Sequence, residues 1–125
     1  MRTPPRSSSS VRARSLDRNA VLADLRAVAA THGAALREIA EIRLFGSLAR
    51  GTANPYADAD LLVVLDATDL PFRDRLPRYK PMGSPVPLDV TVCTREELSR
   101  ELSAGNRFVR RMVDDSIILY VRKTE

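Results

Sequence analysis

The sequence has only one cysteine, Cys93, and no long hydrophobic run. A single cysteine excludes an internal disulfide framework and a zinc site built from cysteines, and it predicts a reducing compartment, the cytoplasm. A membrane-spanning helix needs roughly eighteen or more apolar residues in a row. No segment approaches that length, so we expect no integral membrane protein. The 125 residues, 44% hydrophobic and 29% charged, suit one globular domain.

Net charge is absent from most of the chain, although the whole chain carries a formal charge of +4. Residues 1–15 hold four arginines, two adjacent prolines and a run of serines, but no acid. We interpret this segment as a disordered basic tail, because it offers no core to bury. The domain is then expected over 16–125, and its balanced charge argues against a nucleic-acid partner.

Hydrophobic periodicity predicts how the elements follow one another along the chain. Apolar residues at helical spacing predict a helix from Asp17 to His32, which Ser15 or Asp17 can cap and Gly33 can end. Strands are predicted over 39–45, 61–65, 86–93 and 117–121. Short helices are expected near 72–76, after the capping box that Thr94 opens, and around 108–113.

The run from Leu61 to Leu65 is continuously apolar, which is typical of a strand covered on both faces. This strand should therefore be central. The order of elements lacks the regular alternation of a doubly wound fold. We therefore expect an α/β (α+β) fold, with a small mixed sheet and flanking helices.

Three aspartates are the candidate catalytic residues. Asp58 and Asp60 are two apart at the start of the central strand, so both should point to one face. An isolated Asp-x-Asp is a short and frequent pattern. Asp89, however, interrupts an otherwise apolar strand face, at a point where a neighbouring strand could bring it beside the pair. Three acids converging from two strands are what a two-metal phosphoryl or nucleotidyl transfer site requires, and magnesium prefers such oxygen ligands.

Gly46, Ser47 and Arg50 are the candidate phosphate-binding residues. If the strands on either side of the connection pair antiparallel, Ser47 and Asp58 lie at the same end of the sheet. Glycine allows a phosphate to approach the backbone closely, and a hydroxyl, amides and a guanidinium can bind it. Gly-Ser alone would be an ordinary turn.

Together these motifs resemble the nucleotidyltransferase superfamily related to DNA polymerase beta, in particular the minimal nucleotidyltransferases. The shared pattern is Gly46-Ser47, ten residues, Asp58-Ala59-Asp60, and the later acid Asp89. The resemblance covers roughly residues 20–121. The sequence departs from it at Ala57, where relatives often carry serine, and in the proline-rich segment 66–87.

The resemblance implies the nucleotidyltransferase fold and the transfer of AMP from ATP, with two Mg²⁺ ions expected. The acceptor would attack the α-phosphate and release pyrophosphate. Asp58, Asp60 and Asp89 would ligate metal and serve catalysis, while Gly46, Ser47 and Arg50 would bind the nucleotide.

The resemblance also suggests the partner. We expect no room for an acceptor-binding domain in 125 residues. Stand-alone members of this kind are typically antitoxins of HEPN-domain toxins, and some transfer AMP to a toxin tyrosine. Two alternatives remain open: an antitoxin that acts by binding alone, and a nucleotidyltransferase of antibiotics or other small molecules. We expect Cys93 to be a small buried hydrophobic residue. For Arg107, Arg110 and Arg111 we expect a solvated helix face, with a partner-facing patch as the alternative.

Overall fold

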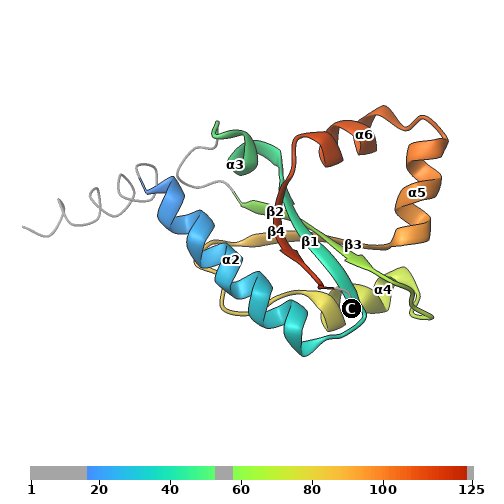
Figure 1. Ribbon diagram of the computed structural model, residues 1–125, viewed down its shortest axis with the longest axis horizontal. Coiled ribbons are helices and arrows are strands. Elements are labelled where there is room, and N and C mark those ends of the chain that lie inside the picture. Colours follow the sequence, from blue (N-terminus) through green and yellow to red (C-terminus); the bar gives the residue numbers. More distant parts are fainter. Residues whose placement is uncertain (1–16, 53–57, 124–125) are drawn as a thin grey trace, which may run out of the picture.

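The computed structural model describes residues 17–52 and 58–123, and it contains a four-stranded sheet (Figure 1). The strands are Ile39–Phe45 (β1), Ala59–Leu65 (β2), Leu88–Thr94 (β3) and Ile117–Val121 (β4). They are arranged in the order β3-β2-β1-β4. β1 is antiparallel to β2 and β4, whereas β2 and β3 are parallel. The predicted mixed sheet is confirmed.

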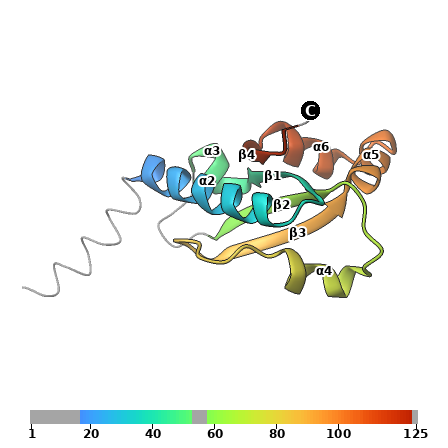
Figure 2. The ribbon, with the colours of Figure 1, turned by 60° about the horizontal axis from the view of Figure 1, so that its bottom comes forward.

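The helices are Arg18–Ala35 (α2), Gly46–Arg50 (α3), Phe72–Tyr79 (α4), Arg95–Ser103 (α5) and Arg107–Asp114 (α6). α5 and α6 lie next to each other and apart from α2 (Figure 2). α4 belongs to the crossover that the parallel pairing of β2 and β3 requires. The flanking helices of the expected fold class are therefore present.

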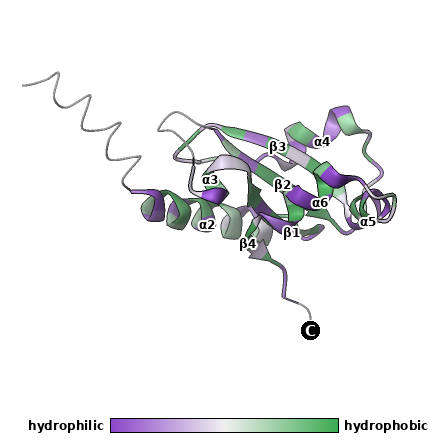
Figure 3. Ribbon diagram, turned by 90° about the horizontal axis from the view of Figure 1, so that it is seen from above, coloured by the Kyte–Doolittle hydropathy of each residue, from purple (hydrophilic) through white to green (hydrophobic). Residues whose placement is uncertain are grey.

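β2 occupies a central position, as its sequence predicts. All five residues from Leu61 to Leu65 are at most 1% exposed. Leu61, Val63 and Leu65 belong to the same buried cluster as residues of α2, while Leu62 faces residues of α5 and α6. β2 is mostly hydrophobic, whereas hydrophilic and hydrophobic positions alternate along α2 (Figure 3). Burial on both faces explains why the run shows no alternation.

The predicted end of the first helix is wrong. α2 continues past Gly33 to Ala35, and Gly33 is buried against the ring of Tyr120. Glycine stands there because a side chain would collide with that ring. Asp17 occupies the N-cap position, but its side chain makes no capping hydrogen bond. The other predicted cap, Ser15, lies outside the described residues, as does the expected tail 1–15.

The predicted capping box at the start of α5 is confirmed. The Glu97 amide donates to Thr94 Oγ1 at 3.0 Å, and the Thr94 amide donates to Glu97 Oε1 at 2.9 Å. The buried Arg75 of α4 donates two further hydrogen bonds to Glu97, at 2.8 and 3.0 Å. Glu97 therefore caps the N-terminus of α5 and connects α5 to α4 through Arg75.

α4 is longer than the short helix expected near 72–76. It continues through Pro77 to Tyr79, and the Lys80 amide donates to the Leu76 carbonyl at 3.0 Å. Among the described residues, no helix is both long enough and apolar enough to span a membrane.

Candidate active site

The strand register brings two of the three predicted acids side by side. Asp60 is paired with Asp89 across the parallel strands β2 and β3. On its other side, Asp60 is paired with Phe45, the last residue of β1. The condition set by the sequence is met, because β1 and β2 pair antiparallel, and the Gly46 and Ser47 turn lies at the same end of the sheet as the acids.

Gly46 lies directly against the Asp60 carboxylate. Its φ angle of 80° is in the left-handed region that favours glycine, and a β-carbon there would collide with Asp60 Oδ2. α3 begins at this residue and is closed by the Thr52 amide, which donates to the Ser47 carbonyl at 2.9 Å. The backbone can approach the carboxylate this closely only because position 46 has no side chain.

Asp60 carries a negative charge that its surroundings disfavour. Burial raises the pKa of Asp60, and the neighbouring carboxylates of Asp89 and Asp58 raise it further. The Arg50 guanidinium opposes this shift only in part. The structure thus places Arg50 within electrostatic reach of the acids, as predicted, while leaving an excess of negative charge.

These residues line a cavity of about 530 Å³ between the sheet and α6. Of the predicted site residues, its wall contains Gly46, Arg50, Asp60 and Asp89. Ser47 and Asp58 are not among the described residues that line it. Asp58 precedes the first residue of β2, and its side chain is exposed.

The opposite wall consists of α6 residues that sequence reasoning did not assign to the site. They are Phe108, Val109, Arg111 and Met112, followed by Asp115 just after the helix. Arg111 is exposed, as expected of a solvated helix face, but its side chain also lines this cavity. Arg110 does face solvent and pairs with Asp114 at 4.0 Å. Phe108, Arg111 and Asp115 are spaced three and four residues apart, a signal that could have shown that they share a face.

The chemistry of the acid pair suits a magnesium ion. Within residues 17–52 and 58–123, no three His, Cys, Asp or Glu side chains form a group that could hold a metal. Magnesium commonly takes only one or two protein carboxylates and completes its shell with water and phosphate oxygens. Asp60 and Asp89 supply such a pair, and a cation would offset the repulsion that raises the pKa of Asp60.

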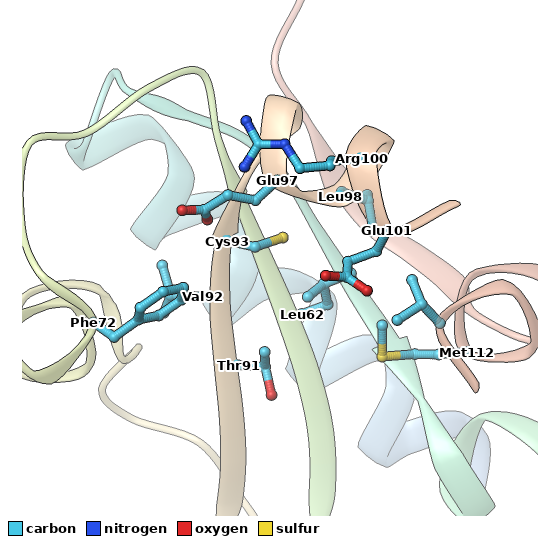
Figure 4. A pocket seen from close by; sticks show the side chains of 11 residues that line it. Leu62, Phe72, Thr91, Val92, Cys93, Glu97, Leu98, Arg100, Glu101 and Met112 are labelled. Carbon is cyan, nitrogen blue, oxygen red and sulfur yellow. The ribbon is translucent and has the colours of Figure 1, made fainter. Parts of the chain in front are cut away.

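A second cavity, of about 400 Å³, lies along β3 beneath α5 (Figure 4). Thr91, Val109 and Met112 line both cavities, so the two are adjacent. Burial raises the pKa of Cys93, which faces this second cavity, to about 11. The thiol stays neutral at pH 7, as expected of a small hydrophobic residue, but it is half-buried where burial was expected.

Comparisons with known proteins agree with this geometry. A family described as "Nucleotidyltransferase domain" matches residues 32–120. The fold is similar to a crystal structure from Sulfolobus solfataricus, named there as a "putative nucleotidyltransferase", with a TM-score of 0.61 and 20% identity. That similarity covers 90% of this chain and 88% of the other. A search of curated proteins gives no significant match.

Proposed function

The chain belongs to the nucleotidyltransferase domain family, and we propose that it is a magnesium-dependent enzyme that transfers AMP from ATP to a partner protein. The observation that carries this proposal is the pairing of Asp60 with Asp89 in the cavity that Gly46 and Arg50 also line. It combines carboxylates for a metal, a close backbone approach and a cation for phosphate.

The residues divide the work as follows. Asp60 and Asp89, with Asp58 nearby, would hold magnesium, which supplies neutralisation of phosphate charge when bound. Arg50 binds and orients the triphosphate, and Gly46 allows the turn after β1 to lie directly against the Asp60 carboxylate. The acceptor oxygen forms a bond to the α-phosphorus while the bond to the bridging oxygen of pyrophosphate breaks. Asp89, which is exposed, completes the site or accepts the acceptor's proton.

The acceptor in this proposal is a hydroxyl, most plausibly that of a tyrosine, on a HEPN-domain toxin for which the protein is the antitoxin. The exposed side chains of the cavity include the charged groups of Arg50, Asp89 and Arg111. A side chain presented by a second protein can therefore reach the acids. We propose this partner by analogy with the minimal nucleotidyltransferases, which the motif resembles.

The test is incubation with the product of a neighbouring toxin gene and labelled ATP. We expect AMP on a partner hydroxyl, and we expect the double variant Asp58→Asn with Asp60→Asn to lose transfer while still binding the partner. A double variant that neutralises the toxin as well as the wild type would favour an antitoxin acting by binding alone. Adenylylation of an aminoglycoside without any partner binding would favour a small-molecule enzyme.

A further inference from the structure

We propose that α6 forms the second wall of the nucleotide site, where Arg111 binds the phosphates and Phe108 stacks on the base. This inference rests on the proposed function, because it requires a nucleotide in the cavity of Asp60 and Asp89. It assigns roles to two residues outside the Gly-Ser and Asp-x-Asp motifs.

One face of α6 is directed at the acid cavity. Phe108, Arg111 and Asp115 follow one another at intervals of three and four residues, which places them on the same side of a helix. All three line the cavity that contains Asp60 and Asp89. The adjoining Met112 points from α6 toward the sheet (Figure 4). The orientation of α6 therefore sets Arg111 and Phe108 opposite the acids.

Arg111 lines the cavity, and among the described residues its guanidinium makes no salt bridge or side-chain hydrogen bond within the protein. Its neighbour Arg110 pairs with Asp114 on the solvent side. With Arg50 on one wall and Arg111 on the other, a triphosphate beside the acids would meet a guanidinium from each side. Guanidinium groups bind phosphate oxygens through two parallel hydrogen bonds.

Phe108 exposes an aromatic ring at the same cavity. The Phe108 side chain is 73% exposed, which is unusual for a large hydrophobic residue, and it lies on a helix that also carries several charged residues. A planar base stacked on this ring would remove apolar surface from water, and such stacking tolerates any base because each has a π-face. Asp115, just after the helix, adds a negative charge that opposes phosphate binding, and Arg111 supplies the positive charge that offsets it on this wall.

Titration calorimetry with magnesium and either ATP or inorganic tripolyphosphate separates the two roles. Arg111→Gln should weaken binding of both ligands by about tenfold or more, as expected for loss of a charge-assisted hydrogen bond. The matched control Arg110→Gln should stay within about twofold of the wild type, since exposed pairs contribute little. Phe108→Leu should weaken ATP binding by about fivefold or more and leave tripolyphosphate binding unchanged.

A second control is Phe72→Leu, which removes another exposed ring, one that lines the second cavity. It should leave both affinities unchanged. Equal tripolyphosphate affinity for Arg111→Gln and Arg110→Gln, or equal ATP affinity for Phe108→Leu and Phe72→Leu, would overturn the assignment. If the wild type binds ATP through Arg111 but transfers no AMP, the assignment holds and the proposed function fails. If the wild type transfers AMP and the α6 variants bind both ligands as tightly as the wild type, the proposed function holds and the α6 assignment fails.

Discussion

Gly46 and Asp60 are in direct contact across the end of the β1–β2 pair, and no side chain fits between them. This contact joins the two halves of the site, the turn after β1 and the acid on β2. It requires both a left-handed backbone and the absence of a β-carbon at position 46. The Gly-Ser part of the motif is therefore tied sterically to the Asp-x-Asp part.

Replacing Gly46 by alanine should damage the site beyond the cost of its backbone conformation. A left-handed φ costs a non-glycine residue about 1–2 kcal/mol, and Gly46→Ala must also displace the Asp60 carboxylate. Gly83→Ala is a matched control, because Gly83 has a φ of 84° and open space around it. Urea unfolding should show a larger loss for Gly46→Ala, and calorimetry should show weaker MgATP binding for it alone. Equal results for the two variants would refute the steric argument.

Asp60→Asn should stabilise the protein in the absence of metal and nucleotide at pH 7. The raised pKa of Asp60 means that the folded protein holds this proton more tightly than the unfolded chain does. The ionised carboxylate therefore lowers the free energy of unfolding at pH values above its folded-state pKa. We expect a melting temperature a few degrees higher for the variant at pH 7, measured by calorimetry.

That advantage should shrink as the pH falls through the folded-state pKa, because the wild-type carboxyl then becomes neutral too. Added magnesium should stabilise the wild type more than the variant. An Asp60→Asn protein that is less stable than the wild type at pH 7 without metal would contradict the assigned electrostatic repulsion.

Glu97→Gln should destabilise the fold far more than Glu96→Gln, its neighbour on α5. Glu97 binds the largely buried Arg75 and the Thr94 amide, so its loss weakens charge-assisted hydrogen bonds worth about 1–3 kcal/mol. Glu96 pairs with Arg100 on an exposed surface, where a substitution usually changes stability by about 0.5 kcal/mol or less. Urea unfolding of the two variants measures the difference.

The pH dependence gives an independent check on Glu97. The hydrogen bonds from Arg75 hold the pKa of Glu97 below its usual value. Its stabilisation is thus present above the unfolded-state pKa and is lost as the pH falls through the folded-state pKa. The stability gap between the wild type and Glu97→Gln should narrow in that range. A gap that is constant with pH would show that the ionised form is not responsible.

Gly33→Ala should destabilise the protein although alanine favours helices. In an exposed helix this change gains roughly 1 kcal/mol, but here the new methyl group would collide with the Tyr120 ring. Trimming the ring with Tyr120→Leu should make the two changes non-additive in a double-mutant cycle of unfolding free energies. A stabilising Gly33→Ala would show that the helix does not pack closely on β4.

The strands could be predicted from the sequence because their patterns are local. The apolar run of β2 indicated a central strand, and Asp89 was predicted on a strand that could lie beside it, as β3 does. Gly33 could not be interpreted in this way, since a glycine that ends a helix and one that admits a distant ring look alike. Only the packing of β4 against α2 distinguishes them.

The site residues that belong to the motif could be predicted from the sequence. The residues that reach the site only through the placement of α6 in the fold could not. Gly46, Arg50, Asp60 and Asp89 came together as expected. Arg110 and Arg111 are identical neighbours in sequence, so no local pattern shows which of them faces the acids. That depends on how α6 lies over the sheet, and an element's placement in the fold cannot be inferred from two identical neighbouring residues.

The most direct test of nucleotidyl transfer at Asp60 and Asp89 uses ATP labelled on either the α- or the γ-phosphate, incubated with the protein and the toxin that we propose as its partner. We expect the α-label to become attached to the partner and the γ-label to leave as pyrophosphate. The double variant Asp60→Asn with Asp89→Asn should transfer neither label while remaining folded by calorimetry. Attachment of the γ-label, or undiminished transfer by the double variant, would contradict the assignment of this cavity as a nucleotidyltransferase active site.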